Sequence, residues 1–118
     1  MRKIGWIGAG IMGQPMVIHL LNKGYEVHVY ARHPERVEQA KNAGAILEES
    51  IVSLTSNVDV ICTMVGFPSD VKEVYDVIFS CIEKGKTCID FTTSSPKLAK
   101  ELYTKGKDGV DIYTKEKY

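Results

Sequence analysis

The opening residues of this chain decide its fold: residues 2–13 read RKIGWIGAGIMG. A short apolar run ends in three glycines, Gly8, Gly10 and Gly13, with the spacing G-x-G-x-x-G, and an amphipathic segment follows at once. This pattern predicts a buried strand, a tight turn and a helix whose first turn faces a phosphate group. The N-terminus of such a helix offers unpaired N–H groups and a partial positive charge, and both attract anions.

The whole chain has 118 residues, enough for one domain with a real core. Lys+Arg and Asp+Glu each number 15, so the formal net charge is zero and no overall field favours nucleic acid or anionic lipid. No apolar run approaches the roughly 18 residues of a membrane span. The opening run is also too short and too rich in glycine for a signal peptide. We therefore expect a cytoplasmic protein with no nucleic-acid partner and no membrane partner.

Three cysteines, Cys62, Cys81 and Cys88, lie far apart in the sequence and in apolar surroundings. None of them is spaced from another cysteine or from a histidine as zinc ligands are. Cys62 and Cys88 fall on predicted strands that could be neighbours. We expect buried or half-buried thiols that stay reduced in the cytoplasm, and no metal site.

The rest of the chain alternates predicted strands and helices. Strands are expected at residues 3–7, 25–30, 45–47, 58–64, 87–91 and 110–113. Helices are expected at residues 11–23, 34–43, 50–56 and 69–82, and from 95 to near 106. Helices of this length between strands are crossovers, so the pattern predicts a single α/β domain with a doubly wound parallel sheet, a Rossmann fold.

Several side chains are expected to be structural. In the first helix Met12, Met16 and Leu20, with Val17 and Leu21, form one predicted buried stripe. Trp6 is expected in the core, Tyr75 on a packed helix face, and Asp59 and Asp90 in hydrogen bonds at strand ends.

In this fold, ligands bind outside the carboxyl ends of the strands. Four connections are expected there: residues 8–13, 31–33, 64–67 and 92–94. Because the glycine pattern follows a predicted strand, opens a predicted helix and lies in the first βαβ unit, it indicates dinucleotide binding. A tight turn in a fold that binds something else is the alternative, and an S-adenosyl or other adenosine ligand is a further one.

The residues after the second strand choose between NAD and NADP. An acidic residue there would bind the ribose 2′-hydroxyl of NAD, whereas an arginine would accept the 2′-phosphate of NADP. Ala31 and Arg32 occupy this place, no acidic residue comes before Glu35, and Arg36 lies one helical turn further on. An arginine fork suits a phosphate dianion. We favour NADP over NAD, with a solvated surface arginine as the alternative interpretation of Arg32.

Residues 4–16, IGWIGAGIMGQPM, resemble the opening of the β-hydroxyacid dehydrogenase family, which includes 3-hydroxyisobutyrate dehydrogenase and, more distantly, 6-phosphogluconate dehydrogenase. Residues 89–96, IDFTTSSP, are similar to the family's I-D-x-S-T-x-S-P. The resemblance covers about residues 1–112. It implies NAD(P)-dependent oxidation of a β-hydroxyacid, or the reverse reduction of a semialdehyde.

The resemblance also implies roles for individual residues. The glycine loop with Met12 would hold the pyrophosphate, Arg32 the 2′-phosphate, Met64 and Val65 the adenosine side, and Thr93 the nicotinamide ribose. Val65-Gly66 departs from the family's Leu-Pro, so the contacts of that loop do not carry over directly. The full set of expected cofactor-binding residues is Gly8, Gly10, Ile11, Met12, Gly13, Ala31, Arg32, Met64, Val65 and Thr93.

The family continues after this point with a substrate loop and an all-helical domain that carries a catalytic lysine and an asparagine. This chain instead reads YTKEKY at residues 113–118. We therefore expect a cofactor-binding domain over residues 1–113, a tail at 114–118 outside the family pattern, no helical domain and no catalytic residue.

Two functions remain open from the sequence. The chain would bind cofactor but not turn over substrate alone, or it would be a non-enzymatic dinucleotide-sensing module that works through a partner protein. In the family the helical domain packs on this one and contributes to dimerisation. Apolar surface left exposed by its absence favours self-association, so we expect a homodimer.

Overall fold

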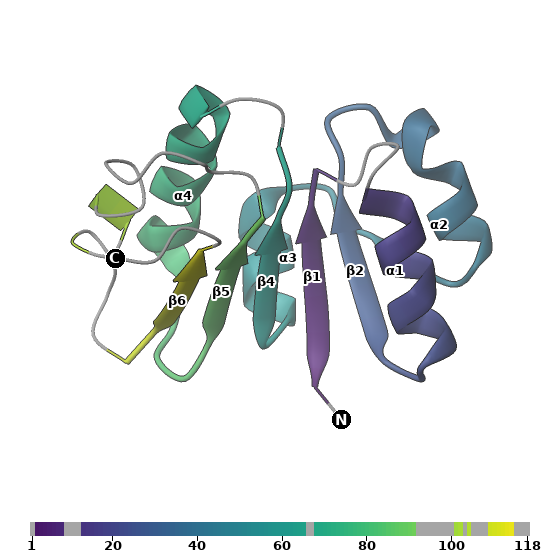
Figure 1. Ribbon diagram of the computed structural model, residues 1–118, viewed down its shortest axis with the longest axis horizontal. Helices are drawn as coiled ribbons and strands as arrows, with labels where there is room; N and C mark the ends of the chain where they lie inside the picture. The colour runs from purple at the N-terminus through teal and green to yellow at the C-terminus, as the bar shows by residue number, and fades with distance from the viewer. Residues whose placement is uncertain are drawn as a thin grey trace.

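The computed structural model of the chain is a sheet of six strands flanked by helices (Figure 1). It describes residues 2–8, 13–65, 68–91, 101–102, 104 and 109–114. The strands lie in the order β3-β2-β1-β4-β5-β6, and each neighbouring pair is parallel. The predicted fold class, a doubly wound parallel sheet, is therefore confirmed.

The strands lie close to where the sequence predicts them. Their bounds are β1 Lys3–Ile7, β2 Glu26–Tyr30, β3 Ile46–Leu47, β4 Val60–Thr63, β5 Thr87–Asp90 and β6 Asp111–Thr114. Strand β6 continues through Thr114, which the sequence had placed in the tail. The strand therefore has the expected four residues but lies one residue further along the chain.

The helices follow the predicted alternation with two differences. They are α1 Gly13–Asn22, the 3₁₀ helix η1 Pro34–Val37, α2 Glu38–Asn42, α3 Ile51–Asn57 and α4 Pro68–Cys81. The single helix expected over residues 34–43 is instead two short helices, η1 and α2. The helix expected from residue 95 lies mostly outside the described residues, although Glu101 and Leu102 are helical.

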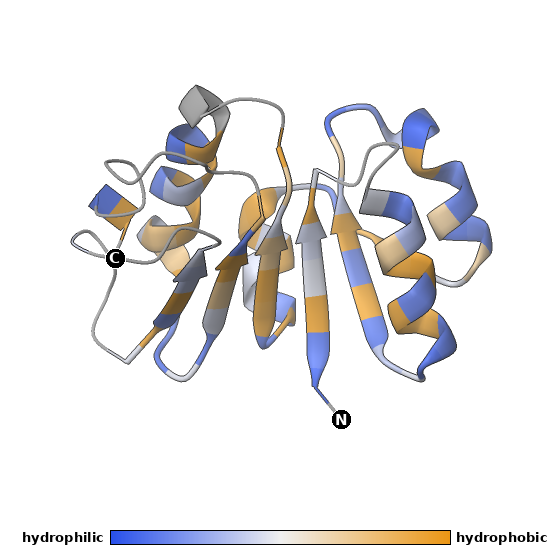
Figure 2. Cartoon of the chain, viewed as in Figure 1, coloured by the Kyte–Doolittle hydropathy of each residue, from blue (hydrophilic) through white to orange (hydrophobic). Residues whose placement is uncertain are grey.

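Two apolar cores lie on the two faces of the sheet. Helices α1 and α2 cover one face, where Trp6, Val17 and Val29 are buried together. Helices α3 and α4 cover the other face, where Ile61 and Tyr75 belong to the second core. Strand residues alternate between these cores, and Figure 2 shows the resulting alternation of blue and orange along β2.

Two glycines end helices where the sequence predicts it. Gly24 has a φ of +94°, its N–H donates to the Leu21 carbonyl, and the N–H of Tyr25 donates to Leu20. This is a Schellman motif, which satisfies the last carbonyls of α1 and turns the chain toward β2. Gly44, with a φ of +114°, ends α2 by the same pair of bonds.

The helix expected over residues 34–43 is broken by a side chain from α1. In an uninterrupted α-helix the N–H of residue 40 donates to the carbonyl of residue 36. Here the Gln14 amide lies between these groups: its Nε2 donates to the Arg36 carbonyl (2.9 Å), and its Oε1 accepts from the Ala40 N–H (3.2 Å). The chain is therefore 3₁₀ through Val37 and α-helical only from Glu38.

Candidate functional site

The carboxyl ends of the central strands lie in line at one edge of the sheet. The N–H of Gly8 donates to the Tyr30 carbonyl (3.3 Å), and the N–H of Met64 donates to the Ile7 carbonyl (2.9 Å). The pattern continues after β5, because the N–H of Phe91 donates to the Thr63 carbonyl at the end of β4 (2.8 Å). The loops that the sequence assigned to a ligand site therefore leave the sheet side by side.

Gly8 stands where the chain leaves β1, and no other residue fits there. Its φ is +86°, a conformation that L side chains rarely adopt. A Cβ at Gly8 would lie 2.2 Å from the Met64 carbonyl oxygen and 3.0 Å from a Val65 methyl carbon. Gly8 therefore has the backbone conformation expected of a glycine at the start of the predicted turn, and its missing side chain lets the ends of β1 and β4 approach closely.

The other residues of the glycine loop are described only in part. Gly13 is buried and is the first residue of α1. Gly10, Ile11 and Met12 lie outside the described residues, as does Thr93 with the turn around it. The roles that the sequence assigned to these side chains stay predictions.

The end of β2 presents a cation at this edge. Ala31 packs partly against the α1 core, whereas Arg32 and His33 are exposed. Glu35, the first acidic residue after β2, has its Oε1 3.7 Å from Nδ1 of the exposed His33 ring. Arg32 has no ion pair with a described residue, so its guanidinium is available to an anion from solvent.

The end of β4 separates the two cores. Met64 packs on the core beneath α1, and Val65 packs on the core beneath α4. Both side chains are half-buried and lie just beyond the strand. They form an apolar floor between Gly8 and the end of β5.

A buried polar network joins β4, β5 and α4 below this floor. Thr63 Oγ1 donates to Asp90 Oδ1 (2.8 Å), so the Tyr75 hydroxyl, 2.9 Å from Thr63 Oγ1, must be the donor in their bond. Burial raises the pKa of Tyr75 well above its ordinary value, which keeps that proton in place. The strand-end hydrogen bond predicted for Asp90 is confirmed. The sequence did not reveal the network, although a threonine inside a run buried on both faces signals a need for a partner.

Comparison with known proteins decides the family. Residues 3–111 match the family described as the NAD binding domain of 6-phosphogluconate dehydrogenase. The chain belongs to this family. It is an NAD-binding domain of the hydroxyacid dehydrogenases, and the resemblance inferred from the glycine stretch is confirmed.

Individual relatives support the same assignment. The uncharacterized oxidoreductase YkwC of Bacillus subtilis is 44% identical over 110 residues, which are 91% of this chain and 38% of YkwC. The structure of Mycobacterium tuberculosis 3-hydroxyisobutyrate dehydrogenase has a TM-score of 0.87 at 25% identity, covering 95% of this chain and 39% of that one. This NAD-binding domain thus spans about two-fifths of the length of the relatives it matches.

Solved structures similar to this domain hold either dinucleotide. One, titled Psf3 in complex with NADP⁺ and 2-OPP, has a TM-score of 0.86 at 29% identity over 92% of this chain and 40% of that one. An imine reductase variant from Myxococcus stipitatus in complex with NAD⁺ has a TM-score of 0.74 at 26% identity over 95% of this chain and 38% of that one. The family match and these two structures therefore support nicotinamide dinucleotide binding.

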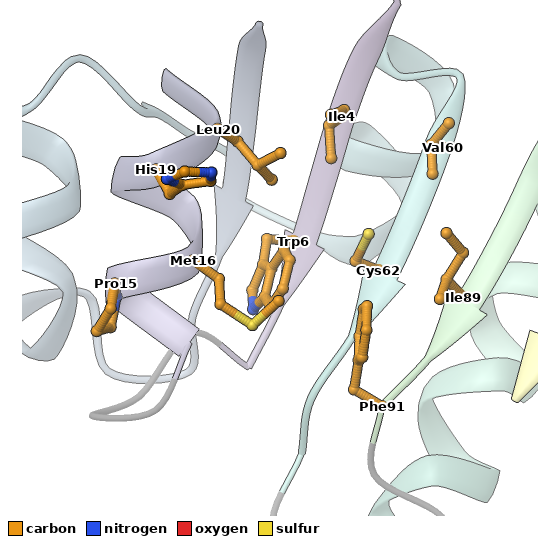
Figure 3. Close-up of a pocket in the computed structure, with 10 residues that line it drawn as sticks. All are labelled: Ile4, Trp6, Pro15, Met16, His19, Leu20, Val60, Cys62, Ile89 and Phe91. Carbon is orange, nitrogen blue, oxygen red and sulfur yellow. The ribbon is translucent and has the colours of Figure 1, made fainter. Parts of the chain in front are cut away.

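The NAD-binding domain also has an open apolar groove of about 400 Å³ beside α1 (Figure 3). Trp6 stacks on Phe91 in its floor, with ring centroids 5.6 Å apart, so the predicted core role of Trp6 is confirmed. Met16 lines the groove and is 39% exposed. The expectation that Met16 belongs to a buried stripe is wrong, because α1 packs against β2 and leaves a groove over β1, β4 and β5 open on this side.

The three cysteines of the NAD-binding domain are free thiols. Cys62 and Cys88 are free and buried, and they face opposite cores from neighbouring strands. The described part of the chain has no group of His, Cys, Asp and Glu arranged to hold a metal ion. None of the helices in the described ranges is long and apolar enough to cross a membrane.

A histidine held by two carboxylates was not foreseen from the sequence. His28 is buried on β2, with Nδ1 2.6 Å from Glu48 Oε2 and Nε2 2.7 Å from Glu26 Oε2. Only the protonated ring can donate from both nitrogens, so the geometry fits an imidazolium. The cluster lies below the carboxyl edge, at the middle of β2, and ties β2 to the chain before α3.

Proposed function

We propose that this domain binds NADP in preference to NAD and serves a β-hydroxyacid dehydrogenase or semialdehyde reductase. The observation that carries the preference is Arg32, an exposed guanidinium at the carboxyl end of β2 with no ion pair to a described residue. The 2′-phosphate is the group that distinguishes NADP from NAD, and an arginine fork binds it through charge-assisted hydrogen bonds. Arg36, exposed four residues later in η1, is a second cation nearby in the sequence.

The glycine loop would receive the pyrophosphate. Gly8 ends β1 with a positive φ and α1 begins at Gly13, so the first N–H groups of α1 would bind phosphate oxygens as helix N-termini do. Gly10, Ile11, Met12 and Gly13 would complete this contact. Ala31 would line the adenosine ribose.

The apolar floor would receive the rest of the cofactor. Met64 and Val65 are half-buried beside Gly8 and would pack on the adenosine side. Thr93 would hold the nicotinamide ribose through its hydroxyl. When bound, the dinucleotide supplies the hydride chemistry, and this chain's residues hold and orient it.

We expect binding without turnover from this chain alone. Dehydrogenation needs a group that takes or gives a proton beside the substrate carbon. Met64, Val65 and Phe91, the described residues that follow β4 and β5, carry no such group. A chain that binds NADPH, lacks turnover and co-purifies with another protein would instead favour the non-enzymatic sensing module.

The change Arg32→Asp tests the cofactor preference. We expect NADPH affinity to fall about 10- to 100-fold, the cost of losing charged hydrogen bonds, while NADH affinity changes little. Arg2→Asp is the matched control because Arg2 is exposed and precedes β1 at the opposite end of the strands. An unchanged NADPH-to-NADH affinity ratio in Arg32→Asp would show that Arg32 is only a surface arginine.

We also propose that the chain forms a homodimer. β6 is the last strand of the described sheet, its Tyr113 is 55% exposed, and an edge strand offers unpaired backbone groups to a second chain. Light scattering gives the test, and a monomer at micromolar concentration would contradict the proposal.

A further inference from the structure

Gln14 connects two parts of the candidate site that are far apart in sequence. It is the second residue of α1 and directly follows Gly13, the last glycine of the loop. Its amide donates to the Arg36 carbonyl and accepts from the Ala40 N–H, at 2.9 Å and 3.2 Å. In a continuous α-helix these two backbone groups would bond to each other. Here the Gln14 side chain bonds to both of them instead and forms a bridge between them.

The bridge fixes the backbone that carries the arginines. Arg32 comes just before η1, and Arg36 is the residue whose carbonyl Gln14 holds. Both guanidinium groups are exposed, and neither has an ion pair with a described residue. Their positions relative to the glycine loop therefore depend on how the segment from residue 32 to residue 40 is anchored.

A ligand that carries phosphate at two separate places, a pyrophosphate and a 2′-phosphate, makes this anchoring important. In NADP the pyrophosphate and the 2′-phosphate are joined through one ribose, so their separation is nearly fixed. A protein that binds both must hold its two anion-binding segments at the matching separation, because positional freedom lowers affinity. NAD lacks the 2′-phosphate and does not depend on the second segment in this way.

We propose that Gln14 is a positioning residue for dinucleotide selection. Its amide holds residues 36–40 at a set distance from the first turn of α1, so that Arg32 and Arg36 meet the 2′-phosphate while the glycine loop meets the pyrophosphate. This inference rests on the proposed NADP preference. It assigns selectivity to a residue that touches neither phosphate.

The test compares Gln14→Met with Gln39→Met in the full 118-residue chain. Methionine is close to glutamine in length but cannot form either hydrogen bond. Gln39 is exposed on α2, next to Ala40, so the same chemical change there is a matched control. NADPH and NADH dissociation constants are measured by titration, and exchange of the Ala40 N–H is followed by NMR.

In Gln14→Met we expect NADPH affinity to fall about 3- to 10-fold, NADH affinity to change less than about 2-fold, and the Ala40 N–H to exchange faster. Gln39→Met should match the wild type. Gln14→Asn keeps the amide but shortens the side chain by one methylene, so it should shift the affinity ratio in the same direction while disturbing the fold less.

Equal losses for both dinucleotides would overturn the inference, because Gln14 would then stabilise the domain as a whole. An unchanged ratio in both Gln14 variants would overturn it as well. In either case tight NADPH binding by the wild type would leave the proposed function intact. A wild-type chain that does not prefer NADPH would overturn the proposed function and the inference together.

Discussion

The hydroxyl of Thr63 donates a hydrogen bond of 2.8 Å to the carboxylate of Asp90, and these are the last residues of β4 and β5. The same hydroxyl accepts from Tyr75 of α4, so three elements meet at one oxygen. All three side chains are buried. The network therefore holds together the strand ends from which two predicted cofactor loops depart.

Thr63→Val should lower the free energy of unfolding by about 1–3 kcal/mol, because it keeps the shape of the side chain and leaves the buried Tyr75 hydroxyl without its acceptor. Urea unfolding measures the change. Thr63→Ser retains the hydroxyl and should cost clearly less. Equal losses in the two variants would mean that the methyl group, rather than the network, matters.

Gly8→Ala should lower the free energy of unfolding more than Gly44→Ala does. A Cβ would meet the Met64 carbonyl at 2.2 Å in addition to the strain of a φ of +86°. We expect a loss of more than about 3 kcal/mol in the free energy of unfolding.

Gly44→Ala is the control for backbone strain alone. Gly44 has a φ of +114° with nothing within 4 Å of an added Cβ, so its cost should be about 1–2 kcal/mol. Similar urea midpoints for Gly8→Ala and Gly44→Ala would contradict the close approach of β1 and β4.

Glu48 should make stability depend on pH in the acid range. Burial alone would raise the pKa of Glu48, but hydrogen bonds from Ser53, Asn57 and His28 outweigh it and leave that pKa below its usual value of 4.5. The pKa of Glu26 is lowered too, chiefly by its hydrogen bond from His28. A folded-state pKa below the unfolded one gives stability that is present above about pH 4.5 and lost as the pH falls through the folded value.

Glu48→Gln should therefore lower the free energy of unfolding at pH 7 by about 1 kcal/mol and flatten its decline as the pH falls below about 4.5. Urea unfolding at a series of pH values gives the slope. Glu73→Gln changes an exposed carboxylate on α4 and should leave the slope as it is. If the two variants decline with the same slope, Glu48 does not carry the effect.

The cysteines should differ sharply in reactivity. Burial raises the pKa of Cys62 to about 12 and that of Cys88 to about 12, whereas Cys81 is partly exposed on α4. Since the thiolate is the reactive form, a thiol reagent at pH 8 should modify Cys81 alone in the native chain and all three after unfolding. Rapid native modification of Cys62 or Cys88, located by mass spectrometry, would show that the sheet opens.

The sequence predicted the layout of the sheet because its signals are local. Apolar runs, the glycines Gly24 and Gly44 at helix ends, and the glycine loop each act within a few residues. The parallel direction of the strands follows from the βαβ alternation. The strand-end role of Asp90 could be expected for the same reason.

What the sequence missed depends on contacts between distant residues. The split of the 34–43 helix comes from Gln14, which is 22 residues from Arg36 and 26 from Ala40. Neither the periodicity nor the capping of residues 34–43 contains this information. The exposure of Met16 depends likewise on which strands α1 leaves uncovered, and that is set by the whole sheet.

We propose that this domain holds NADP through its glycine loop and Arg32. Isothermal titration of the wild-type chain with NADPH and with NADH tests it most directly. We predict saturable binding of one dinucleotide per chain, tighter for NADPH than for NADH. Binding of neither dinucleotide would contradict the claim, and tighter binding of NADH would contradict the role given to Arg32.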